Sequence, residues 1–213
     1  MNTLEYLVKK YDIDITQKSP IEIRGVGRLD LLRWLRELNM KKGVEVGVEK
    51  GVYSHLICEI NSQMTLWGVD PYEKYDGYRE YKDQAEMNWI FEEMKKKLAS
   101  PIKHGQFHIV RKKSMDALAD FADESLDFVY IDANHEFNYP LKDIEGWYPK
   151  VKKGGILAGH DYVRHAQMEF TVKDGLKEFT LKNNIHPWFI LGLYRKRRGE
   201  LRDSTRSWLI PKL

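Results

Sequence analysis

Cysteine is almost absent from this sequence, because Cys58 is the only one among 213 residues. A single cysteine cannot form a disulfide within the chain, which excludes the disulfide-stapled folds of small secreted proteins. Cys58 stands in the apolar surroundings of Leu56, Ile57 and Ile60. This position is typical of a small residue that fills a core.

Long apolar runs are also missing. No stretch approaches the roughly 20 apolar residues that cross a bilayer, and the first residues do not resemble a signal peptide. The sequence therefore predicts no membrane contact and a cytoplasmic location.

A large excess of one charge is lacking as well, because the net charge is only +3. The basic residues gather at Arg195-Lys196-Arg197-Arg198, with Arg202 and Arg206 nearby. Such a cluster can contact phosphate, but no recognition motif accompanies it. A solvated loop is therefore favoured over nucleic-acid binding.

The chain also lacks internal repeats, low-complexity segments and linkers. With 213 residues it is long enough for one sizeable core and short for two. We therefore interpret residues 1–213 as a single domain. Residues 1–40 are predicted to form a helical N-terminal arm or cap, which is a candidate lid or homodimer contact.

What the chain does contain is an alternation of strand-like and helix-like segments. Strands are expected at residues 44–48, 66–69, 107–110, 126–131 and 155–158, and helices at 29–38, 53–60, about 87–98, 117–121, 139–148 and 169–182. Two late apolar runs, 188–193 and 208–210, are expected to form an antiparallel hairpin at the sheet edge. The fold class is therefore α/β, with a doubly wound, mostly parallel, seven-stranded Rossmann-like sheet.

The stretch from Val44 to Ser54 organises the predicted site. Its apolar run leads into Gly47 and Gly51, where the chain can turn sharply and a ligand can approach the main chain. The next strand ends in Asp70, and a carboxylate at that place can accept hydrogen bonds from both hydroxyls of a ribose. Together these features predict a nucleoside-binding half of a doubly wound sheet.

Further polar residues follow the other predicted strands. They are Ser114, the segment Asp132-Ala133-Asn134-His135, and the pair His160-Asp161. Ligands of such sheets bind beyond the carboxyl ends of the strands. We therefore expect these side chains to share one cleft.

Several motifs carry a resemblance to a known family. They are Glu45-Val-Gly47-Val-Glu-Lys-Gly51, Gly68-Val-Asp70-Pro-Tyr72, Phe128-Val-Tyr-Ile-Asp132-Ala-Asn-His135, Asp143-Ile-Glu145-Gly-Trp147, Lys153-Gly-Gly155-Ile-Leu-Ala-Gly-His160-Asp161-Tyr162 and Ser207-Trp208-Leu-Ile. In these the chain resembles the class I S-adenosylmethionine-dependent methyltransferases of the group called methyltransferase family 24. The resemblance spans about residues 40–210.

That resemblance implies roles in cofactor binding. Gly47 and Gly51 would shape the loop beneath the methionine part of S-adenosylmethionine, and Glu45 would orient this loop or the cofactor's amino group. Asp70 would bind the ribose hydroxyls. The other implied contacts are Tyr72 near the adenine, Ser114 and Met115 against the adenine ring, and Asp132 at the amino group.

The resemblance also implies catalytic residues. Catechol-type O-methyltransferases hold Mg²⁺ with acids at these strand ends, which points to Asp132 and Asp161 as metal ligands. Those enzymes have a lysine base three residues after the first acid, where this chain has His135, so His135 is the candidate base. The alternative is that Asp132 binds the cofactor without any metal. His160 is interpreted first as a structural residue.

The sequence thus predicts methyl transfer to a hydroxyl of a small molecule such as a sugar or a natural-product intermediate. A nicotinamide-dependent oxidoreductase is the first alternative, but the G-x-G-x-x-G motif is missing. The second alternative is a non-catalytic module that binds a partner protein through the aromatic stretch from Tyr72 to Tyr81 and the basic loop at residues 195–198.

Overall fold

The structure, a computed structural model, describes residues 1–74, 83–133, 139–163, 170–192 and 205–213. The strands are β1 (Ile21–Arg24), β2 (Lys42–Val46), β3 (Thr65–Val69), β4 (Phe107–Val110), β5 (Leu126–Ile131), β6 (Val151–Gly159), β7 (Phe189–Gly192) and β8 (Trp208–Pro211). The helices are α1 (Thr3–Tyr11), α2 (Arg28–Glu37), α3 (Val52–Ile60), α4 (Gln84–Lys97), α5 (Ala99–Lys103), α6 (Ser114–Ala117), α7 (Tyr139–Trp147) and α8 (Val172–Lys182), with short 3-10 turns η1 (Leu118–Asp120) and η2 (Tyr148–Lys150).

All these strands join one sheet in the order β1-β7-β8-β6-β5-β2-β3-β4. Neighbouring strands are parallel except at β8, which runs antiparallel to both β6 and β7. The central strand β5 is buried along its whole length, as expected for a strand covered on both faces. The predicted doubly wound α/β fold with an antiparallel C-terminal hairpin is confirmed.

The sheet has eight strands rather than the seven predicted. The additional strand, β1, pairs in parallel with β7, so β7 is not the sheet edge that the sequence analysis expected. Its residues alternate between buried isoleucines, Ile21 and Ile23, and exposed polar residues. The alternation is a strand signal, but four residues are too few to stand out inside a segment interpreted as a helical arm.

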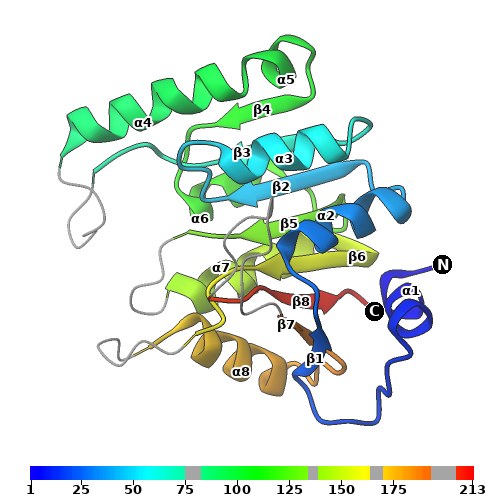
Figure 1. The fold of residues 1–213 in the computed structure, drawn as a ribbon. Helices are drawn as coiled ribbons and strands as arrows, with labels where there is room; N and C mark the ends of the chain where they lie inside the picture. Colours follow the sequence, from blue (N-terminus) through cyan, green and yellow to red (C-terminus); the bar gives the residue numbers. More distant parts are fainter. Residues whose placement is uncertain (75–82, 134–138, 164–169, 193–204) are drawn as a thin grey trace.

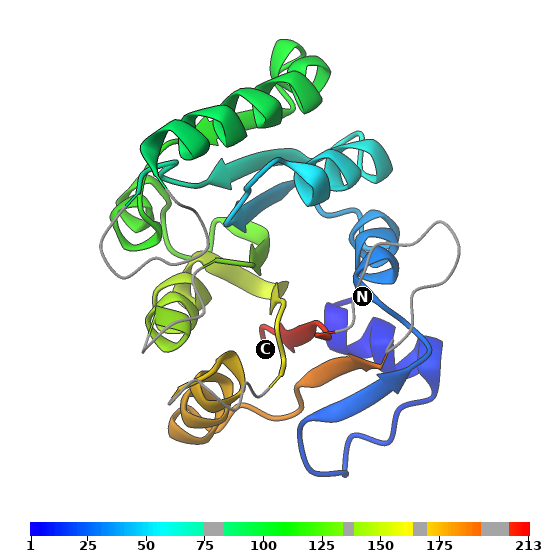
Figure 2. The same cartoon turned by 60° about the vertical axis from the view of Figure 1, so that its left-hand side comes forward.

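Helices cover both faces of the sheet (Figure 1). The apolar residues of α1, α2, α3 and α4 pack with β5 residues such as Tyr130 in one core, whereas α7 and α8 pack with others such as Val129 in a second core. Figure 2 shows the same two layers from a second direction.

The first 40 residues pack against the rest of the molecule. The Thr3 hydroxyl donates a hydrogen bond of 2.7 Å to the carbonyl of Gly154 in β6. Tyr6 and Lys10 of α1 both donate to Glu37 of α2, at 2.5 and 2.6 Å. These contacts support the single-domain interpretation, which stays a prediction.

Two predicted element boundaries move for local reasons. β2 ends at Val46 rather than residue 48, because Gly47 has a φ of +86° and turns the chain. β6 begins at Val151 rather than at residue 155, so the strand is longer than predicted. None of the helices among the described residues combines the length and apolar character needed to cross a bilayer.

Candidate functional site

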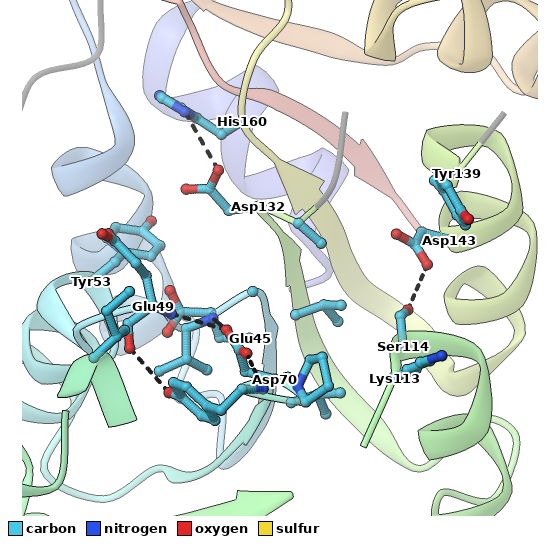
Figure 3. Close-up of a pocket in the computed structure, with 18 of the residues that line it drawn as sticks. Glu45, Glu49, Tyr53, Asp70, Lys113, Ser114, Asp132, Tyr139, Asp143 and His160 are labelled. Carbon is cyan, nitrogen blue, oxygen red and sulfur yellow. Dashed lines mark hydrogen bonds and ion pairs between the residues drawn. The ribbon is translucent and has the colours of Figure 1, made fainter. Parts of the chain in front are cut away.

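A pocket of about 470 Å³ opens where β2, β3, β5 and β6 end. Its volume lies within the range of about 300–1,000 Å³ that is typical of small-molecule sites. The predicted site residues that line it are Glu45, Gly47, Asp70, Tyr72, Ser114, Met115 and Asp132 (Figure 3). The structure therefore brings together most of the residues that the sequence singled out. His135 lies outside the described residues.

Gly47 stands where two chain segments meet most closely. A Cβ at this position would lie only 2.0 Å from the carbonyl oxygen of Asp132 and 2.9 Å from the Cα of Ala133. The Gly47 N–H donates a hydrogen bond of 2.9 Å to Val69. Gly47 thus lets the ends of β2, β3 and β5 converge on the pocket.

Gly51 stands at the end of the same loop as Gly47, and its predicted role beneath the cofactor stays a prediction. It precedes α3 with a φ of +69° and does not belong to the pocket lining. A Cβ there would lie 2.8 Å from Leu98 and 3.1 Å from Met94. Gly51 therefore serves the turn and the close packing of α4 against α3.

Asp70 holds the loop that follows β2. Its Oδ2 accepts hydrogen bonds from the backbone N–H groups of Val48 (3.0 Å) and Glu49 (3.1 Å), and its Oδ1 accepts one from Tyr72 (2.9 Å). Burial raises the pKa of Asp70 from its ordinary value, and these three backbone bonds oppose the rise. A carboxylate has about four acceptor sites, so room remains for one more donor.

Tyr72 supports the same loop. It is buried with a φ of +50°, and its hydroxyl donates a hydrogen bond of 3.1 Å to the carbonyl of Glu49. Its ring packs against Phe91 of α4 with centroids 4.8 Å apart. Tyr72 and Asp70 thus both hold the loop at Glu49.

Glu45 is a buried acid near the end of β2. The Ser54 hydroxyl donates a short hydrogen bond to Glu45 Oε2. Burial raises the pKa of Glu45 to about 8, and the nearby Asp132 carboxylate adds to the rise while Ser54 and Arg28 oppose it. Glu45 therefore stays protonated at neutral pH in the folded protein without ligand.

The raised pKa of Glu45 predicts a pH dependence of stability. The folded protein keeps the Glu45 proton up to about pH 8, whereas the unfolded chain loses it near the ordinary value of 4.5. The stabilisation is therefore complete below pH 4.5 and is lost as the pH rises through 8. Relative to the wild type, Glu45→Gln should gain about 4 kcal/mol in the free energy of unfolding between about pH 5 and about pH 8.5. Urea unfolding of both proteins across this range measures the gain, and a constant difference would contradict the assignment.

Ser114 is held by two residues for which the sequence analysis proposed no role. Its hydroxyl donates a hydrogen bond of 2.5 Å to Asp143 and accepts one of 2.9 Å from the Trp147 indole (Figure 3). Asp143 also lines the pocket. Both residues stand in a motif that the sequence analysis quoted, but only the fold shows that α7 brings them to Ser114. Met115 lies at the rim, with 44% of its surface exposed.

Asp132, His160 and Asp161 form a cluster at the ends of β5 and β6. Their candidate ligand atoms all lie within 4.8 Å of one another. His160 Nδ1 is 3.7 Å from Asp132 Oδ1 (Figure 3). It is 3.3 Å from Asp161 Oδ1. Two carboxylates and an imidazole in this arrangement can bind a divalent cation. His160, interpreted from the sequence as structural, thus lies inside the site.

Arg28 and Tyr53 are pocket residues that the sequence analysis missed. Arg28 begins α2, and its Nη1 lies 3.5 Å from Asp132 Oδ2. The guanidinium lies over the Tyr53 ring, 5.3 Å from its centroid. The sequence carries no signal for this contact, because residues 28 and 132 are 104 positions apart.

The described lining of the pocket is strongly acidic. It holds the carboxyl groups of Glu45, Glu49, Asp70, Glu73, Asp116, Asp132 and Asp143, and the cationic side chains of Arg28 and Lys113. Such a lining favours a ligand that carries positive charge.

Comparisons with known proteins show which family the chain matches. The profile of a methyltransferase domain family, methyltransferase family 24, matches residues 44–162, which is more than half of the chain. A comparison with curated proteins found no sequence match.

Solved structures share the fold at low sequence identity. The O-methyltransferase from Bacillus cereus, in complex with S-adenosylhomocysteine, gives a TM-score of 0.60 at 13% identity, covering 99% of this chain and 90% of that one. A candidate caffeoyl-CoA O-methyltransferase from Staphylococcus aureus gives 0.59 at 18% identity, with coverage of 99% and 93%. TomG from Streptomyces achromogenes, an O-methyltransferase of tomaymycin synthesis in complex with S-adenosylmethionine, gives 0.59 at 12% identity, with coverage of 96% and 86%.

Proposed function

This chain belongs to the methyltransferase domain family and is an S-adenosylmethionine-dependent methyltransferase, and on this premise we propose that it methylates a hydroxyl of a small molecule with the help of a divalent cation. One observation carries the proposal. The loop at Gly47 and the cluster of Asp132, His160 and Asp161 meet at the same pocket, since both Gly47 and Asp132 line it. A cofactor bound at the loop would therefore lie beside the cluster that is proposed to bind the cation and, through it, the acceptor hydroxyl.

The chemistry of the pocket lining fits this cofactor. S-adenosylmethionine carries a sulfonium and an ammonium, and carboxylates of the lining such as Asp132 offset positive charge. Asp70 retains an acceptor site for a ribose hydroxyl after its three backbone bonds. Ser114 and Met115 offer a hydroxyl and an apolar surface to the adenine ring of the cofactor. These roles remain proposals.

The chain's own residues would prepare the acceptor. When bound, S-adenosylmethionine supplies an electrophilic methyl group, which an oxygen can take up once its proton leaves. A hydroxyl is a poor nucleophile before it loses that proton, so a base near Asp132 is needed. We assign this role to His135. The loop that Asp70 and Tyr72 fix would align the reacting groups, which supplies much of the rate enhancement in such displacements.

The cluster of Asp132, His160 and Asp161 would hold the cation. A bound divalent cation lowers the pKa of a coordinated hydroxyl. The sequence analysis named Mg²⁺ with two acids as ligands. His160 adds an imidazole to the donor set, and imidazole ligands suit transition metals better than Mg²⁺. We therefore extend the proposal to Mn²⁺ and similar ions.

Metal dependence is the first test of this function. Release of S-adenosylhomocysteine is measured over a panel of small alcohols, sugars and phenols, after chelation and after addition of Mg²⁺ or Mn²⁺. Asp161→Asn should raise the cation concentration for half-maximal activity about 10-fold or more, because a charged ligand is lost. Asparagine tolerates the φ of +55° at this position, so the backbone should be unaffected.

Asp116→Asn is the matched control, because Asp116 lines the pocket outside the cluster. Full activity after chelation would contradict the metal, while methyl transfer to amines alone would contradict the hydroxyl acceptor.

The role of His135 gives a second test. His135→Ala should lower kcat about 100-fold and leave the affinity for S-adenosylmethionine unchanged, because a base acts on the acceptor rather than on the cofactor. Single-turnover kinetics together with calorimetric titration separate the two effects. His104→Ala, at an exposed histidine beyond α5, serves as the control. Unchanged turnover would show that His135 is not the base.

The remaining expectations concern partners. A small-molecule acceptor fits a pocket whose rim carries the exposed side chains of Val52, Met115 and Tyr139. A homodimer through residues 1–40 remains a proposal, which sedimentation analysis of the full chain and of a chain without α1 would test.

A further inference from the structure

Arg28 is the cationic side chain at the end of the pocket where Glu45 and Asp132 lie, which we call the acidic end. We propose that its guanidinium binds the carboxylate of the cofactor's methionine part and so selects cofactors that carry an intact amino acid. The inference rests on the proposed function, since it takes S-adenosylmethionine as the ligand.

The structure fixes Arg28 before any ligand arrives. Its main-chain carbonyl accepts a hydrogen bond of 3.1 Å from the Tyr53 hydroxyl, and its guanidinium lies over the Tyr53 ring. Tyr53 in turn packs against Tyr130 of β5 with ring centroids 4.5 Å apart. The guanidinium therefore rests on a ring that is itself fixed against the sheet, which lowers the entropic cost of binding an anion.

The charges around Arg28 match an amino acid. Arg28 lies 3.5 Å from Asp132, and it is close enough to Glu45 to lower the pKa of that carboxyl against the effect of burial. A zwitterion needs a cation for its carboxylate and an acid for its ammonium. Arg28 with Glu45 and Asp132 offers both within one corner of the pocket.

The other lining cation occupies a different place. Lys113 lies with Ser114 and Asp143, across the pocket from Asp132 and Glu45 (Figure 3). Met115, next to Ser114, adds an apolar surface that suits the adenine ring rather than a carboxylate. Among the described lining residues, Arg28 is thus the one whose fork of N–H donors can bind a carboxylate at the acidic end.

The test compares two ligands that differ only in the carboxylate. Calorimetry gives the affinities for S-adenosylhomocysteine and for decarboxylated S-adenosylhomocysteine. The wild type should prefer the first by about 30-fold or more, the range expected for a buried charge pair. Arg28→Met, which keeps an unbranched stem over Tyr53, should lower affinity for S-adenosylhomocysteine about 30-fold and change that for the decarboxylated form less than about 3-fold.

Further variants and outcomes make the test decisive. Arg28→Lys should give a preference between those of the wild type and Arg28→Met, because it keeps the charge without the fork. Arg36→Met, at an exposed arginine of the same helix, should retain the full preference. Equal wild-type affinities for the two ligands would overturn the inference, and this comparison needs no variant. An undiminished preference in Arg28→Met would overturn it as well. Failure of the wild type to bind either ligand would instead overturn the proposed function.

Discussion

Gly47→Ala should cost about 4 kcal/mol or more in the free energy of unfolding, enough to leave little folded protein. The added methyl would lie 2.0 Å from the Asp132 carbonyl oxygen, a backbone atom that cannot move without disturbing β5. The φ of +86° adds strain for any residue with a Cβ. Urea unfolding, together with the yield of folded protein, measures the loss.

Gly105→Ala is the matched control for this prediction. Gly105 has a φ of +69°, but a Cβ there would meet no atom within 4 Å. Its substitution should therefore cost only the strain of the left-handed conformation, about 1–2 kcal/mol. Equal losses at the two glycines would mean that the approach of β2 to Asp132 is not what requires Gly47.

Asp70→Ala should weaken S-adenosylmethionine binding about 1,000-fold. Three backbone N–H groups lose their carboxylate acceptor, and hydrogen bonds to charged groups contribute about 1.5–3 kcal/mol each. The loop from Val48 to Glu49 would then have to be ordered by the ligand, at the expense of affinity. Calorimetric titration of the folded variant measures the change.

Two variants help to interpret the Asp70 result. Asp70→Asn keeps one acceptor oxygen for Val48 and Glu49, so its loss should be smaller than that of Asp70→Ala. Glu73→Ala removes another acid from the pocket lining, one with an exposed side chain and no role in the loop, and should change the affinity little. Similar losses in Asp70→Ala and Glu73→Ala would show that general negative charge, rather than loop anchoring, matters.

The fold was largely predictable because its signals are local. Strand runs, helical spacing and the glycines after β2 are properties of a few neighbouring residues, and they led to the correct fold class. β1 escaped because its four residues become a strand through pairing with β7, about 168 positions later. Pairing partners at that distance leave no trace in a short alternating segment.

The candidate site was predictable in part. Its acids and glycines follow strands, so their meeting at one pocket follows from parallel topology alone. The direction in which each side chain points does not follow from the topology. Asp70 was predicted to bind the ribose hydroxyls, which stays a prediction, and only the structure shows that its oxygens also accept hydrogen bonds from backbone N–H groups of Val48, Glu49 and Tyr72. Gly51 was predicted to shape the loop beneath the cofactor, which stays a prediction, and only the structure shows that a Cβ there would also meet Met94 of α4.

The sequence by itself determined the alternating α/β architecture, the sharp turn after β2 and the carboxylates at the strand ends, because backbone dihedral preferences and hydrophobic periodicity act over a few residues. Only the tertiary structure decided that Arg28 reaches Asp132, that Asp143 holds Ser114 and that His160 joins the two acids. Each of these contacts depends on how a distant helix or strand packs against the sheet. Packing of that kind is a property of the whole core, and no single segment encodes it.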